Sequence, residues 1–196
     1  LLSVLTIGLI GFTAWRQWMV VRFFGRAWNS PPSQTTPPPL VSILQPILSG
    51  DPTLPQTLGH NLAASSTYAR EFLWLVDEDD AAGREICGAL VTAYPGVTVR
   101  LLLQPAPPQG VNPKTFKLVN GLAAAHGDVI CVLDDDTMIP DGGLEQCLPY
   151  LDRPGAGLAF GLPYQVNFSN AWSSLIALFV NTNSLPTYVP YASLHE

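Results

Sequence analysis

The chain has 196 residues, of which 47% are hydrophobic and only 12% are charged. This composition excludes a disordered polypeptide and predicts one domain with a packed core, together with a smaller appendage. The formal net charge of −6 excludes nucleic acid as the main partner, because phosphate binding requires a basic surface.

The N-terminal segment is apolar and uncharged over its first fifteen residues, and aromatic and basic residues follow. The aromatic residues are Trp15, Trp18 and Trp28, and the basic ones are Arg16, Arg22 and Arg26. This pattern predicts a transmembrane or membrane-interface helix over residues 1–28, with the following residues on the cytoplasmic side of the membrane. A cleaved signal peptide is the alternative, although its basic residues should precede the apolar run.

Residues 29–39 contain five prolines and no apolar period, which predicts a stiff, extended linker. From residue 40 onward, short β-rich runs alternate with longer helical segments. The predicted strands are 40–44, 72–76, 97–102 and 128–133, and the predicted helices are 53–68, 81–94 and 113–126. The alternation predicts an α/β domain over residues 40–196, with an open, mostly parallel sheet and helices on both faces.

Seven of the 15 acidic residues follow the second and fourth predicted strands. They are Asp77, Glu78, Asp79, Asp80, Asp134, Asp135 and Asp136. The carboxyl ends of parallel strands meet at one edge of a sheet, and carboxylates gathered there repel one another unless a cation is present. Oxygen ligands without paired Cys or His favour Mg²⁺ or Mn²⁺ over Zn²⁺. The alternative is that these residues are solvated caps of strand-end turns.

Both lysines of the chain, Lys114 and Lys117, lie just after Pro113, between the two acidic clusters. Proline suits the first turn of a helix, and a helix N-terminus favours an anion, so Lys114 is a candidate partner for a diphosphate. Two ordinary solvated lysines are the alternative. The three cysteines lack metal-ligand spacing and are predicted to be reduced thiols within the core.

Four motifs in this order resemble the ceramide glucosyltransferase family of membrane-anchored, inverting glycosyltransferases, which have the type A nucleotide-sugar fold. The motifs are Leu75–Asp80, Gly110–Lys114, Gly127–Ile130 with the following acidic triplet, and Gly161–Tyr164. The resemblance covers residues 41–196, and Asn-Pro-Lys and Gly-Leu-Pro-Tyr are its most specific parts.

The resemblance implies a membrane enzyme whose cytoplasmic domain moves a hexose from a UDP-sugar to the hydroxyl of a lipid acceptor. Asp80 matches the family's first conserved aspartate, near the uracil and ribose of the donor. Asp134 and Asp136 match the Asp-x-Asp pair that holds a metal, Mg²⁺ or Mn²⁺, and the donor diphosphate. Lys114 matches the lysine after Asn-Pro, a partner for the diphosphate.

The chain departs from the family pattern in three places. The loop Gln45–Gly50 lacks both basic residues usual there, and Lys117 replaces an asparagine. The resemblance places the general base and a Gln/Arg-x-x-Arg-Trp helix beyond Glu196, so the catalytic base is unknown and the fold is expected to be incomplete at its C-terminus. His195 and Glu196 are candidate bases in principle, but the absence of a cap signal indicates a truncation there.

Two other functions are weighed against this one. A catalytically inactive, membrane-bound nucleotide-binding relative would share these motifs. A receiver-like signalling domain would carry paired acids after its first strand, where this chain has none. The apolar stretch 171–180 is too short to span a membrane and is either an interfacial helix beside the lipid acceptor or a core helix.

Overall fold

The computed structural model describes residues 2–25, 39–166 and 168–195. It divides into two compact units, which we call the sheet unit (residues 33–157) and the helix-pair unit (residues 1–32 and 158–196). Arg26, Trp28 and the predicted linker at 29–38 lie outside the described residues. The assignment of 40–196 to a single domain stays a prediction.

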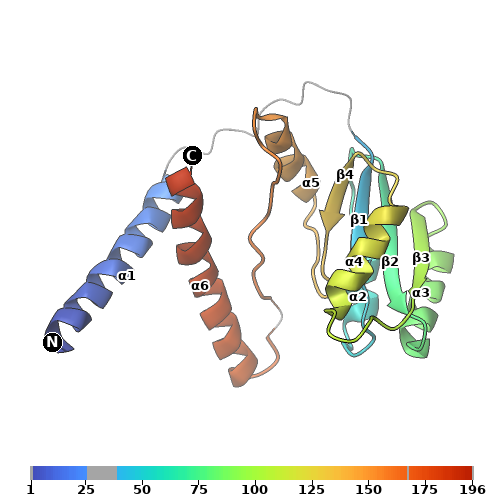
Figure 1. Cartoon of the computed structure of the whole chain (residues 1–196), viewed down its shortest axis with the longest axis horizontal. Coiled ribbons are helices and arrows are strands. Elements are labelled where there is room, and N and C mark those ends of the chain that lie inside the picture. The colour runs from blue at the N-terminus through green and yellow to red at the C-terminus, as the bar shows by residue number, and fades with distance from the viewer. Residues whose placement is uncertain (1, 26–38, 167, 196) are drawn as a thin grey trace. The chain divides into compact units, whose positions relative to one another are not determined.

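The sheet unit contains four parallel strands in the order β3-β2-β1-β4 (Figure 1). The strands are β1 (Val41–Pro46), β2 (Arg70–Asp77), β3 (Thr98–Gln104) and β4 (Val129–Val132). The predicted parallel α/β fold is confirmed. The chain adds β2 and β3 on one side of β1 and then β4 on the other, so the strand order reverses between β1 and β4. Open α/β sheets bind ligands at such a point.

Helices cover both faces of this sheet, as predicted. The apolar side chains of α2 (Leu54–Ala63) and α3 (Ala81–Ala93) join one core cluster, which includes the buried Phe72 and Trp74. On the opposite face, α4 (Pro113–Ala124) covers a smaller cluster centred on Leu73. β1 and β2 are buried along almost their whole length, which explains why apolar residues such as Ile43 and Leu44, and all of Phe72–Val76, stand side by side instead of alternating with polar ones.

Gly121 lets α4 lie close to the sheet. A Cβ atom at this position would come within 2.8 Å of Leu75 Cδ1 and 3.2 Å of Leu44 Cδ2. Both are side chains of strand residues that are at most 1% exposed, and protein cores are packed densely enough for one added methyl group to be felt.

We expect Gly121→Ala to destabilise the sheet unit by about 1–3 kcal/mol, because the added methyl group overpacks this contact. Gly88→Ala in α3 is the matched control, since a Cβ there meets nothing within 4 Å. The control should stabilise the unit by about 0.5–1 kcal/mol through the ordinary helix preference for alanine. Urea unfolding midpoints measure both effects, and equal shifts in the two variants would contradict the close approach.

Some elements differ from the sequence prediction. α2 ends at Ala63 rather than near residue 68, because Ser66 and Thr67 bond to Glu145 and form a turn instead. α5 (Gly143–Cys147) and the 3₁₀ helix η1 (Leu148–Asp152) were not predicted, since each has only five residues and too few to show a period.

The helix-pair unit contains α1 (Leu2–Gly25) and α6 (Ala171–His195), which pack against each other. Of the helices in the described residues, only α1 is both long and apolar enough to cross a membrane, over Ser3–Gly25. α6 is longer than the predicted stretch 171–180 and continues through Pro186 and Pro190.

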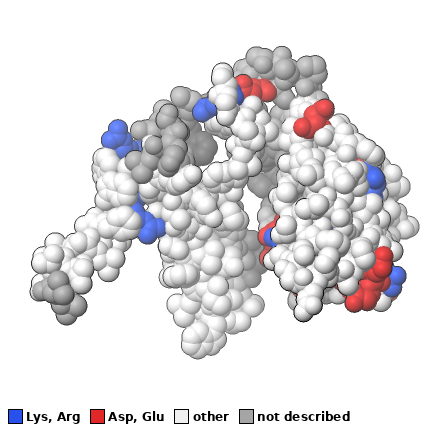
Figure 2. All heavy atoms as spheres, in the orientation of Figure 1, with Lys and Arg blue, Asp and Glu red and all other residues white. Residues whose placement is uncertain are grey.

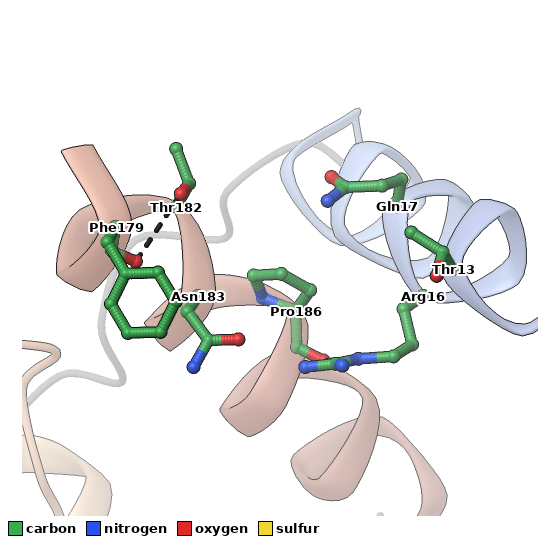
Figure 3. Close-up of a pocket in the computed structure, with 7 residues that line it drawn as sticks. All are labelled: Thr13, Arg16, Gln17, Phe179, Thr182, Asn183 and Pro186. Carbon is green, nitrogen blue, oxygen red and sulfur yellow. Dashed lines mark hydrogen bonds between the residues drawn. The ribbon is translucent and has the colours of Figure 1, made fainter. Parts of the chain in front are cut away.

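Arg16 explains how α6 tolerates Pro190. This proline has no N–H, so the carbonyl of Pro186 loses its donor within the helix. Arg16 Nε donates to that carbonyl at 2.6 Å, and its Nη2 donates to Thr187 Oγ1 at 2.8 Å. Arg16 and Pro186 line a cavity of about 210 Å³ between the two helices (Figure 3).

Charge is distributed unevenly over the chain. Residues 1–25 and 158–195 contain no Asp or Glu, and Arg16 and Arg22 are their only Lys or Arg. The described surface of α1 and α6 is accordingly almost entirely white in Figure 2.

The cysteines are free thiols, as predicted. Cys87 is buried and the other two are partly buried. Burial raises the pKa of Cys87 to about 12, helped by the charges of Asp80 and Asp135, so this thiol stays protonated at neutral pH.

Candidate nucleotide-sugar site

The candidate site lies where the strand order reverses, at the carboxyl ends of β1 and β4. The loop that follows β1, Ile47–Gly50, meets the acidic triplet that follows β4 through a hydrogen bond from Leu48 N to Asp135 Oδ2 at 2.7 Å. The adjacent residue of the loop, Ser49, donates its N–H to Asp80 Oδ2 at 3.1 Å. The structure therefore brings both acidic clusters to one edge of the sheet, as the sequence predicted.

Asp80 is the N-cap of α3 and accepts the amide N–H of Gly83 at 2.9 Å. Burial raises the pKa of Asp80. The hydrogen bonds from Gly83 and Ser49 and the charge of Lys117 together lower the pKa by more than burial raises it, so the net pKa lies below the ordinary range. Asp80 is thus ionised at neutral pH and joins α3 to the β1 loop.

Asp134 and Asp136 point away from the core on an exposed turn in which Thr137 N donates to Asp134 O. Lys114 Nζ forms an ion pair with Asp134 Oδ1 at 2.5 Å, and both side chains are about half exposed. The structure therefore places Lys114 beside the carboxylate that the sequence assigned to the metal and diphosphate.

Asp135, the middle residue of the triplet, points inward. Burial is the main reason that its pKa is raised, and the charges of Asp136 and Asp134 add to the effect, although the N–H of Leu48 lowers it. Its role is to join the β1 and β4 ends, so it is the flanking pair, Asp134 and Asp136, that remains accessible to a ligand.

The sequence did not predict the contacts of Lys117. Its side chain is buried and its Nζ donates to Asp77 Oδ2 at 2.7 Å and to the carbonyl of Ile47 at 3.1 Å. A usable signal was the position of Gly121 one helical turn later, because residues i and i+4 share a helix face and a glycine there indicates close packing.

The N-terminus of α4 offers less to an anion than its sequence suggested. Pro113 has no N–H, and the Asn112 side chain already accepts the N–H of Thr115 at 3.1 Å. The positive charge at this helix end therefore comes mainly from the half-exposed ammonium group of Lys114 rather than from a row of free amides.

The donor atoms suit a hard divalent cation that is held jointly with a phosphate ligand. Among the described residues, no group of three or more His, Cys, Asp or Glu side chains converges to hold a metal. Asp134 and Asp136 supply carboxylate oxygens from one turn, and Mg²⁺ commonly binds one or two carboxylates and completes its shell with substrate phosphates and water.

A solved structure has the same fold. The mannosyltransferase PcManGT from Pyrobaculum calidifontis, solved in complex with GDP-Man and Mn²⁺, matches 79% of this chain with a TM-score of 0.63 and 18% sequence identity. The match covers 44% of that protein. The parallel sheet, with its acidic turn at the point of reversal, is therefore a Rossmann-like fold of the kind found in glycosyltransferases.

The family follows from the sequence match. The family model "Glycosyl transferase family 21" matches residues 1–194, and the chain belongs to this family. The ceramide glucosyltransferase of Komagataella phaffii is 30% identical over 117 residues, which is 58% of this chain but only 23% of the yeast protein. The predicted ceramide glucosyltransferase-like family is confirmed.

Proposed function

We propose that this chain binds the sugar donor in a metal-dependent, inverting glycosyltransferase that moves a hexose from a UDP-sugar to a lipid hydroxyl. The observation that carries the proposal is the ion pair of Lys114 with Asp134, on the exposed turn after β4 that also carries Asp136, in a member of glycosyltransferase family 21. Family membership favours this function over a receiver-like signalling domain.

The chemistry follows from the charges at this edge. A nucleotide sugar carries a diphosphate that becomes the leaving group, so negative charge develops on it as the glycosidic bond breaks. Lys114 donates to a diphosphate oxygen, while Asp134 and Asp136 hold Mg²⁺ or Mn²⁺. A divalent metal at these carboxylates supplies Lewis-acid stabilisation of the departing nucleoside diphosphate.

Asp80 contributes through the shape of the site. Its carboxylate accepts the N–H groups of Ser49 and Gly83, so it holds the N-terminus of α3 against the β1 loop at the edge where the donor would bind. We therefore assign Asp80, Lys114 and Asp134 to donor binding.

Isothermal titration calorimetry with the chain in detergent micelles tests the proposal. We expect UDP to bind in the presence of Mn²⁺ and to lose at least tenfold in affinity when EDTA removes the metal. GDP is the control for the base. Binding that EDTA leaves unchanged, or a preference for GDP over UDP, would contradict the proposed donor and metal.

We further propose that α1 anchors the protein in a membrane with the sheet unit on the cytoplasmic side, because Arg16 and Arg22 lie in its C-terminal half. Protease added to the outside of sealed, right-side-out vesicles should leave the segment after residue 39 intact. Protease added after permeabilisation should cleave it. Cleavage from the outside alone would contradict the orientation.

A further inference from the structure

The loop after β1 is held by three charged side chains at three consecutive residues. Lys117 donates to the carbonyl of Ile47, Asp135 accepts the N–H of Leu48, and Asp80 accepts the N–H of Ser49. The three side chains come from α4, from the turn after β4 and from the N-terminus of α3. We call the segment 47–49 with these contacts the loop clamp.

Lys117 is the one cation among the three charged residues of the loop clamp and the most buried of the three, with 5% of the residue exposed. Its second partner, Asp77 Oδ2 at 2.7 Å, ends β2, so one ammonium group ties together the ends of two strands. A buried ammonium group requires such partners, because an unpaired one would be strongly destabilised by the loss of water.

All three amides of the loop clamp are already bonded, that of Ile47 to the carbonyl of Leu75 at 3.0 Å and the other two to carboxylates, so they are not available to bind phosphate oxygens. What the loop presents at the edge is its shape, including the exposed side chain of Leu48. That shape depends on where Lys117 holds the carbonyl of Ile47. The loop lies at the reversal of strand order, where ligands of α/β sheets bind.

From this geometry we infer that Lys117 is a positioning residue of the donor site, which fixes the loop clamp and Asp77 in the arrangement that receives the nucleotide. This role rests on the proposed function. Lys117 acts through the loop and is not assigned a contact with the metal, which Asp134 and Asp136 hold.

The test compares Lys117→Met, which removes the charge and keeps the length, with Lys117→Arg, which keeps the charge. Lys117→Gln retains a donor for Ile47 and serves if the Met variant does not fold. Arg153→Met, a surface charge loss next to Tyr150, is the matched control. Circular dichroism verifies folding, calorimetry measures affinity for UDP with Mn²⁺ and for Mn²⁺ alone, and hydrogen exchange reports on residues 46–50.

We expect Lys117→Met to weaken UDP binding at least tenfold, to change Mn²⁺ affinity less than threefold and to accelerate exchange in 46–50. Lys117→Arg should recover most of the UDP affinity, and Arg153→Met should match the unchanged chain. UDP affinity unchanged in folded Met and Gln variants, or equal losses in the Met and Arg variants, would overturn the role of Lys117. If the unchanged chain binds no UDP, the proposed function fails and the positioning role with it, whereas exchange in 46–50 still shows whether the loop clamp exists.

Discussion

Asp136→Ala should reduce the Mn²⁺-dependent affinity for UDP by about 100-fold, equivalent to about 2.7 kcal/mol. Asp136 is exposed, and its Oδ1 accepts a hydrogen bond from the hydroxyl group of Thr137 at 3.2 Å. The substitution therefore opens no cavity in the core, and it relieves repulsion by removing one of three adjacent carboxylates. We expect the free energy of unfolding to stay within about 0.5 kcal/mol of the original value.

The matched control is Asp152→Ala, which removes an aspartate at the end of η1 from an exposed position. It should leave both UDP affinity and stability unchanged. Calorimetry with and without Mn²⁺ separates the two contributions, because UDP binding without metal should be weak in every variant. An Asp136→Ala protein that binds UDP with full Mn²⁺ dependence would show that this carboxylate does not hold the metal.

Glu71→Ala should destabilise the sheet unit by about 3 kcal/mol, because it breaks a buried hydrogen-bond network at the amino ends of the strands, away from the candidate site. Glu71 is 3% exposed, and its Oε1 accepts from Ser42 Oγ at 2.6 Å and from His126 N at 2.7 Å. Arg100 pairs with its Oε2 at 3.5 Å. Urea unfolding measures the loss, and a change below 1 kcal/mol would contradict the network.

The same carboxylate predicts how stability depends on pH. Burial raises the pKa of Glu71. The hydrogen bonds from Ser42 and His126 and the nearby charges together lower the pKa by more than burial raises it, so the net pKa lies below the ordinary range. The unfolded chain therefore binds this proton at higher pH than the folded chain. The stabilisation is complete above the unfolded pKa, about 4.3, and is lost as pH falls through the folded pKa.

Below about pH 5, the original protein should thus lose stability more steeply than Glu71→Gln, which cannot titrate at this position. Glu85→Gln on the exposed face of α3 is the control and should follow the original protein. Parallel curves for the original protein and Glu71→Gln would contradict the lowered pKa.

The sheet was predictable because the local sequence of each strand indicates a strand without reference to the rest of the chain. β1 and β2 are mostly apolar and buried on both faces, and each is followed by turn residues and a helical period. α6 was not predictable over its full length, because Pro186 and Pro190 indicate a break in any local reading. The contact that lets Pro190 remain in the helix comes from Arg16, which is 170 residues away from Pro186 in the sequence.

The candidate site shows the same division. Acidic residues after parallel strands had to meet at one edge, so the position of Asp80 and the triplet followed from the topology. The different orientations of Asp134 and Asp135 did not follow, because they depend on the N–H of Leu48 in a loop that pairing of β1 with β4 brings alongside. The buried position of Lys117 depends in the same way on the close packing of α4 against the sheet at Gly121.

Paramagnetic broadening by Mn²⁺ tests most directly the claim that a metal-bound nucleoside diphosphate occupies the β1/β4 edge. The measurement uses the ¹⁵N-labelled chain in detergent micelles, with Mn²⁺ and UDP added together. We predict that the amide signals broadened most strongly belong to residues 134–137, Lys114 and Leu48, and that Asp136→Ala abolishes the effect. Broadening centred elsewhere in the chain, such as at α5, or broadening that Asp136→Ala leaves unchanged, would contradict this site.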